Sequence, residues 1–149
     1  MPERNWTDNL RRGAGMAELD RNTPTLMNLA AGRWYGWDGG SDSLWAHSIR
    51  PLTDPRELAS HPAHLRRLLT TDTELACRWR RSFGALPTDD EALLVLTAKA
   101  LGAFVGSLVS APTTFDRFRE ALSRGDTRGQ ARYPADARRG LQLFVGRGK

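Results

Sequence analysis

Beyond Ser41, apolar residues recur at spacings of three and four along most of the chain, which is typical of helices that bury one face. Leu75, Trp79 and Phe83, for example, fall on one side of a predicted helix, with polar and charged residues on the other. No stretch alternates between apolar and polar positions for long, and no segment repeats. We therefore predict an all-α fold.

Capping and helix-breaking residues set the bounds of the predicted helices, because Ser, Thr and Asp favour helix starts while Gly and Pro favour ends. The predicted helices cover 42–50, a segment opening at Asp54 in TDPREL, a segment from about 61, 71–84, 88–110, 114–125 and 134–145. The first should end before Pro51, because proline disfavours a helical residue before it. Residues 125–133 should form a polar loop.

Two glycines mark the longest predicted helix as a site of close approach. Gly102 and Gly106 lie one turn apart within 88–110, so another helix or a flat ring could come near the backbone there. Packing of helix on helix is the more common of these two arrangements.

The region before these helices has no clear periodicity. Residues 1–23 mix charged residues, glycine and few apolar residues, and we expect a loose arm. In the irregular, glycine-rich segment that follows, Trp34, Trp37 and Trp45 lie around the turn WDGG. So many indoles indicate one of two things. They either form a hydrophobic core in an irregular region or line a pocket for a large flat cofactor.

Composition narrows the possible functions. The chain has 149 residues, 40% hydrophobic and 26% charged, which fits one folded domain. Its net charge of +5 leaves open a small basic helical module that binds nucleic acid or an acidic partner. However, the arginines alternate with acidic residues and no recognition-helix motif occurs, so we expect no nucleic-acid binding. Polar residues interrupt the longest apolar run, 92–109, and no signal-peptide pattern opens the chain, so we expect neither a membrane span nor a leader.

Few residues offer catalytic chemistry. The single cysteine, Cys77, excludes an internal disulfide, a thiolate zinc site and a C-x-x-C-H haem attachment motif. His61 and His64 fit a solvated surface pair better than a metal site. On local grounds His47 fits a structural role, and Glu57 fits the third position of a capped helix, where a carboxylate binds the cap's amide.

Four segments nevertheless resemble, in order, the bacterial di-haem cytochrome c peroxidases and their MauG-type relatives. They are RNTPTLMNLA (21–30), WYGWDGGSDSLWAHSIRPLTDPREL (34–58), AFVGSLVSAPTTFDRFREALSRGD (103–126) and ARRGLQLFVGRGK (137–149). The resemblance implies a cytochrome c-like helical fold. It also implies a loose arm at 1–20, part of the peroxidatic domain at 21–133, and the start of a second domain at 134–149 that stops before its haem motif.

The resemblance assigns roles to two of the residues above. Glu57 matches the family's acid–base glutamate, which moves a proton between the two oxygens of hydrogen peroxide so that the O–O bond breaks heterolytically. His47 stands where the family usually has a glutamine that helps polarise the peroxide, so this chain has a titratable group there.

Other residues would face the haem or a metal. Trp37 matches a tryptophan placed between the two haems as an electron relay, and Trp34 and Trp45 would face the haem beside it. Asn22 and Asn28 match the region of a loop that contributes to a calcium site in the family. The resemblance further implies haem c, a small electron-donor protein, a periplasmic location and a homodimer.

This sequence departs from the family pattern in three ways. It has no C-x-x-C-H motif, Gly40 replaces the arginine of the family's W-D-G-R turn, and no histidine precedes His47. We therefore expect a segment cut from between two haem sites that has no peroxidase activity by itself. Without a haem, it should be a marginally stable helical monomer, with an exposed aromatic cleft lined by Trp34, Trp37 and Trp45.

Overall fold

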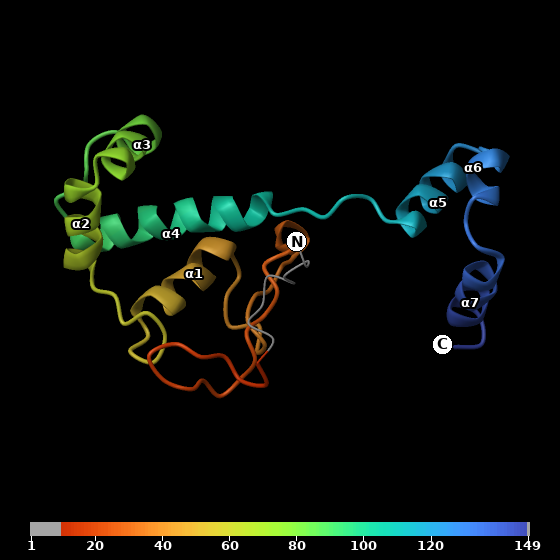
Figure 1. Cartoon of the computed structure of the whole chain (residues 1–149), viewed down its shortest axis with the longest axis horizontal. Coiled ribbons are helices and arrows are strands. Elements are labelled where there is room, and N and C mark those ends of the chain that lie inside the picture. The colour runs from red at the N-terminus through yellow and green to blue at the C-terminus, as the bar shows by residue number, and fades with distance from the viewer. Residues whose placement is uncertain (1–9, 149) are drawn as a thin grey trace. The chain divides into compact units, whose positions relative to one another are not determined.

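The computed structural model describes residues 10–148, and its regular structure is helical (Figure 1). The elements are the 3₁₀-helix η1 (Leu29–Ala31) and the α-helices α1 (Leu44–Thr53), α2 (Pro62–Thr71), α3 (Thr73–Phe83), α4 (Asp90–Ser107), α5 (Thr114–Ser123), α6 (Thr127–Ala131) and α7 (Ala135–Val145). Within residues 10–148 no strand forms, and two isolated bridges, Ala14 with Glu18 and Tyr35 with Ser41, are the extended pairings. The all-α prediction is confirmed.

The chain divides into two compact units, Met1–Val109 and Ser110–Lys149, which we call unit 1 and unit 2. The division falls in the segment between α4 and α5. The domain boundary at residues 133 and 134, which the family resemblance implies, stays a prediction.

Unit 1 is organised around α4, which packs against α1, α2 and η1, while α2 also packs against α3 (Figure 1). Leu93 and Ala98 of α4 are completely buried. At Gly102 the two backbones nearly touch, because a Cβ added there would lie 2.9 Å from the backbone nitrogen of Trp45 in α1. The expectation that these glycines mark helix-on-helix packing is therefore confirmed at Gly102.

Helix α1 continues through Pro51 to Thr53, so the predicted end before this proline is wrong. Pro51 lies in the last turn, where its missing amide costs the helix one hydrogen bond. The following loop compensates at the helix end: the Leu58 amide donates to the Pro51 carbonyl (3.1 Å) and the Ser60 amide to the Leu52 carbonyl (2.7 Å). Burial of Leu52 also anchors this turn.

The predicted helix at TDPREL is wrong as well, because the segment forms one hydrogen-bonded turn and stops. Asp54 does cap the turn as expected: its side-chain Oδ1 accepts from the Arg56 amide (2.8 Å) and its carbonyl from the Glu57 amide (3.0 Å). Ala59 then adopts a left-handed conformation with φ of 48°, which ends any helical continuation.

The remaining helix predictions are close, with local differences at their starts. Asp72 and Asp89, rather than the threonines before them, are the N-caps of α3 and α4, because a carboxylate accepts amide hydrogen bonds at each start. The predicted polar loop 125–133 contains the short helix α6, which the Asp126 side chain caps by accepting from the Gly129 amide (3.0 Å).

The expected loose arm is tied to the rest of unit 1 in its described part. Residues 13–20, which we call the strap, form no helix or strand, but two of their amides donate to the carbonyls of Arg56 and Glu57. The sequence shows no periodicity there because the strap is held by backbone groups and not by a buried apolar face.

Unit 2 has a small aromatic core. The ring of Phe118 stacks on Tyr133 at a centroid distance of 4.5 Å, and the Arg138 guanidinium lies 5.8 Å from the Phe118 ring centre. A capping box between Thr113 and Asp116 starts α5. Across residues 10–148, no helix is both long enough and apolar enough to span a membrane.

Candidate functional site

Glu57 lies on the single turn that follows α1, with its backbone fixed on both sides. Its amide donates to the Asp54 carbonyl (3.0 Å), and its carbonyl accepts from the Met16 amide of the strap (3.0 Å). The side chain is 21% exposed, with Oε1 3.8 Å from Nε of Arg50. The expected local role, capping of a helix by this carboxylate, is therefore wrong because no helix forms there.

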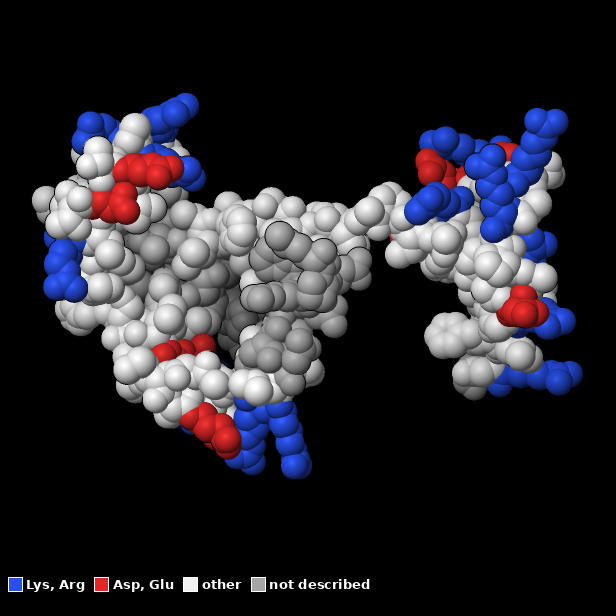
Figure 2. Space-filling view, viewed as in Figure 1, with Lys and Arg blue, Asp and Glu red and all other residues white. Residues whose placement is uncertain are grey.

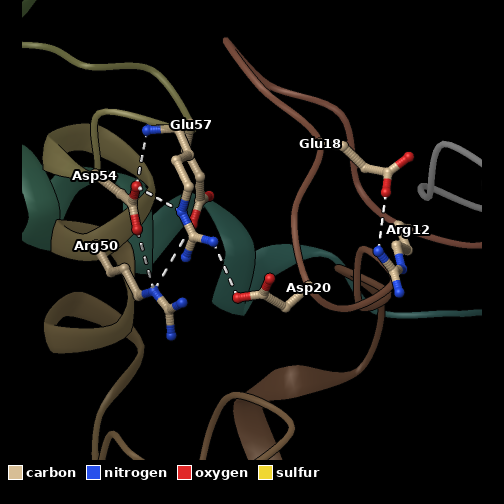
Figure 3. Close-up of polar contacts among 7 residues, drawn as sticks. Arg12, Glu18, Asp20, Arg50, Asp54 and Glu57 are labelled. Carbon is tan, nitrogen blue, oxygen red and sulfur yellow. Dashed lines mark hydrogen bonds and ion pairs between the residues drawn. The ribbon is translucent and has the colours of Figure 1, made fainter.

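Two arginines and three acidic side chains form a cluster around this turn (Figure 3). Nε of Arg50 lies 3.8 Å from both Asp54 Oδ2 and Glu57 Oε1, while Nε of Arg56 lies 3.7 Å from Asp54 Oδ1. Arg56 also donates to Asp20 Oδ2 of the strap (2.9 Å). Each carboxylate of the cluster thus has an arginine beside it.

His47 lies on α1 with its ring partly buried against the preceding turn. The ring stacks on Tyr35 with centroids 6.3 Å apart and planes at 28°. Burial lowers the pKa of His47 below its ordinary value of 6.5, the nearby Glu57 carboxylate acts against that shift, and Arg50 adds to it. The imidazole is therefore neutral at pH 7, when it can both donate and accept a hydrogen bond.

The three indoles predicted to border a cofactor differ in their surroundings. Trp34 and Trp37 are 68% and 63% exposed, so they do not form a tightly packed core. Trp37 is nevertheless fixed, because its Nε1 donates to the Asn22 carbonyl (2.6 Å). Trp45 is 38% exposed and belongs to the contact between α1 and α4, with Lys99 Nζ 5.8 Å from its ring centre.

The asparagines of the expected calcium region have structural partners. The Asn22 side-chain amide donates to the Leu10 carbonyl. Asn28 adopts a left-handed backbone conformation, with φ of 62°, and its amide donates to the Leu108 carbonyl (2.8 Å). No group of three or more His, Cys, Asp or Glu side chains within the described part of the chain could hold a metal ion. Calcium binding at these asparagines stays a prediction.

The other two histidines lie on the exposed start of α2. Nδ1 of His61 accepts from the Ala63 amide (3.2 Å) and so caps the helix, and His64 contacts Arg67 through Nδ1 (2.9 Å). Both contacts agree with the expected surface pair.

The structure brings Glu57 and His47 into one electrostatic environment, and it adds partners that sequence reasoning did not find. Arg50 is one, although it stands three residues after His47 and four before Asp54, spacings that place all three on one helix face. Tyr35 and the strap are the others. Their contacts join residues far apart in the sequence, and no local pattern signals them.

Comparisons with known proteins agree with the segments described above. A sequence profile of the family described as di-haem cytochrome c peroxidase matches residues 1–124. The chain belongs to this family. The resemblance stated from the sequence is thereby confirmed, and haem c is the cofactor of the family.

Three relatives show the extent of the similarity. The chain is 36% identical over 148 residues to the methylamine utilization protein MauG of Methylorubrum extorquens, across 98% of this chain and 39% of that protein. It is 26% identical over 144 residues to the cytochrome c551 peroxidase of Nitrosomonas europaea (95% and 40%). It is 24% identical over 150 residues to the cytochrome-c peroxidase IdrP2 of a Pseudomonas species (98% and 38%). The chain thus spans about two fifths of the length of these curated relatives.

Proposed function

We propose that this chain is the peroxide-handling segment of a di-haem cytochrome c peroxidase-like protein, with Glu57 as its acid–base residue and His47 as a hydrogen-bonding partner. Family membership supports the reaction class. The observation that carries the assignment is the placement of Glu57: a mostly buried carboxylate on a backbone-fixed turn, electrostatically coupled to a neutral imidazole.

The proposed chemistry of Glu57 is proton transfer. Its carboxylate takes the proton from one oxygen of hydrogen peroxide and returns it to the other, so that this second oxygen leaves as water. A haem bound beside this segment would supply the two electrons that the cleavage needs. Arg50 limits the orientations of the carboxylate, and the neutral His47 ring orients the peroxide by a hydrogen bond. Because the imidazole is partly buried, it does not take up the proton at neutral pH.

Attachment of haem c does not fit the residues of this chain. A c-type haem is bound through the two cysteines and the histidine of C-x-x-C-H, whereas the 149 residues contain one cysteine, Cys77, which is exposed. We propose that the chain by itself attaches no haem covalently and has no peroxidase turnover. What it supplies is the protein environment beside a haem held by other cysteines.

The exposed indoles of Trp34 and Trp37 fit a surface that lies beside a haem. Trp37 is held by its hydrogen bond to the Asn22 carbonyl while most of its ring stays exposed, so we propose it as the electron relay. Trp34 would add a second flat apolar surface beside the haem. A small electron-donor protein and a periplasmic location complete the proposal, by analogy with the family.

Expression of the chain with a haem-maturation system tests the first part of the proposal. We expect no covalent haem, hence no Soret band that survives denaturation, and no peroxide consumption. A covalently attached haem would contradict the proposal.

A chimera tests the role of Glu57. In this chimera the segment replaces its counterpart in a haem-bearing relative, and Glu57→Gln should lower kcat/KM for peroxide by about 10²- to 10⁴-fold at unchanged haem content. Glu74→Gln is the matched control, because Glu74 also pairs with an arginine, Arg78, but on the exposed face of α3. Equal kcat/KM values for the two variants would rule out the acid–base role.

A further inference from the structure

The strap forms a short backbone ladder with the turn that carries Glu57. The Met16 amide donates to the Glu57 carbonyl and the Ala17 amide to the Arg56 carbonyl, each at 3.0 Å. The strap is also closed on itself, because the Leu19 amide donates to the Gly13 carbonyl (2.8 Å). The strap is therefore a closed loop that binds the turn through backbone groups.

At Gly15 the strap and the turn are too close for any side chain. A Cβ at this position would lie 2.5 Å from the Arg56 carbonyl oxygen and 2.7 Å from the Cα of Glu57. Both atoms belong to the backbone, so neither can move away as the end of a flexible side chain could. Only glycine permits this contact.

A charged contact fixes the other end of the strap. Arg56 donates to Asp20 Oδ2 (2.9 Å), and this hydrogen bond and the arginine's charge lower the pKa of Asp20 below its ordinary value. Arg56 forms a second ion pair with Asp54, whose Oδ1 lies 3.7 Å from Arg56 Nε (Figure 3). Arg56 of the turn is therefore paired both with the strap, through Asp20, and with Asp54.

We infer that the strap is a positioning device for Glu57, and that Gly15 is its essential residue because the turn and the strap meet there backbone to backbone. The importance of that position rests on the proposed acid–base role of Glu57. The positioning itself concerns the folded chain and can be tested without haem or peroxide.

The experiment uses the full 149-residue chain and NMR titration of the His47 ring. Glu57, Arg50 and Asp38 are the charged groups that act on this imidazole, and Glu57 raises its pKa. Glu57→Gln should therefore lower the His47 pKa, which gives the reference shift. Gly15→Ala should lower it in the same direction, by at least half of that reference, because the carboxylate is released from its fixed place.

Gly140→Ala is the matched control, since a Cβ at Gly140 meets no atom within 4 Å. It should leave the His47 pKa unchanged. If Gly15→Ala titrates like this control, or if Glu57→Gln does not shift His47, the positioning role is wrong.

A second variant decides the matter if Gly15→Ala abolishes folding. Asp20→Asn removes one partner of the strap's ion pair without demanding backbone space, and it should lower the His47 pKa by a smaller amount. No shift in this variant would overturn the inference. The proposed function is judged separately, because a chimera insensitive to Glu57→Gln would refute the acid–base role and leave the positioning result intact.

Discussion

The contacts inside unit 1 differ in kind from those inside unit 2. Besides its buried apolar side chains, unit 1 has two backbone contacts where no side chain fits: the strap meets the turn at Gly15, and α4 meets α1 at Gly102. Unit 2 depends on a stack of aromatic rings around Phe118 and Tyr133. A backbone contact tolerates almost no substitution, whereas a ring stack loses its stability when one ring is removed.

Charge differs between the units as well. Unit 1 has 13 Lys and Arg residues against 13 Asp and Glu, and unit 2 has nine against four, which accounts for the 22 basic and 17 acidic residues of the sequence. Unit 2 therefore carries the whole net charge of +5. On the face that Figure 2 shows, arginines gather over α5 and α6 of unit 2. The candidate catalytic residues thus lie in the unit without net charge, while the other unit carries the excess of positive charge.

Removal of the Phe118 ring should have the largest effect on stability. Phe118→Ala should destabilise unit 2 by about 3 kcal/mol or more, because Phe118 is buried and so short a unit has little other core. Amide protection in α5 and α6 should be lost in hydrogen exchange. The control Phe144→Ala removes a ring that is 77% exposed, and it should change stability by less than about 0.5 kcal/mol. Similar effects of both variants would show that the stack is not the core of unit 2.

A methyl group at the helix contact of unit 1 should have the next largest effect. Gly102→Ala should cost about 2 kcal/mol, because its Cβ would lie 2.9 Å from the Trp45 backbone nitrogen. Gly106→Ala, in the same helix, would meet Leu44 Cδ1 at an ordinary 3.7 Å and should stabilise the helix by up to about 1 kcal/mol. Urea unfolding of the two variants measures the difference. A stabilising Gly102→Ala would contradict the close contact.

The sequence predicted those parts of the fold that depend on local chemistry. Caps and glycine stops located α3, α4, α5 and α7 within a few residues. The errors at Pro51 and TDPREL have one cause: amides of later loop residues donate to the last carbonyls of α1, and a single turn replaces a helix. Propensity rules use only the residues next to a helix boundary. They do not include a later loop that folds back and forms hydrogen bonds with the helix end.

For the candidate site, the family resemblance pointed to Glu57 and His47, while the groups around them are known only from the tertiary structure. Local reasoning assigned Glu57 a capping role, which the structure does not show. Gly15 could not be singled out, because a glycine in an aperiodic arm looks the same whether it is free or pressed against a backbone forty residues away. Which groups hold a carboxylate in place is decided by tertiary contacts, and these leave no periodic pattern.

Mild acidification should lower the stability of unit 1 and not that of unit 2, because all three histidines belong to unit 1. His47 is the histidine responsible. Its pKa is lowered in the folded chain, so the unfolded chain binds protons more readily. The contribution of neutral His47 to stability is therefore complete above pH 6.5 and falls as the pH drops from 6.5 through the folded-state pKa. His47→Gln should flatten this part of the urea-derived stability profile between pH 7.5 and 5.5. An unchanged slope would show that His47 is not buried as described.

The charge asymmetry should give the smallest effect, in association and not in folding. Arg128 and Arg132 of unit 2 make no ion pair with another residue of the described chain, so their charges should attract an acidic partner. The double substitution Arg128→Gln and Arg132→Gln should weaken binding to poly-glutamate by roughly twofold to fivefold at low salt, and the difference should vanish near 1 M salt, where screening acts over about 3 Å. The same charge loss at Arg80 and Arg81 should matter less, because unit 1 carries no net charge that would attract the polymer. Equal losses for the two pairs would mean that net charge alone, and not its concentration in unit 2, governs attraction.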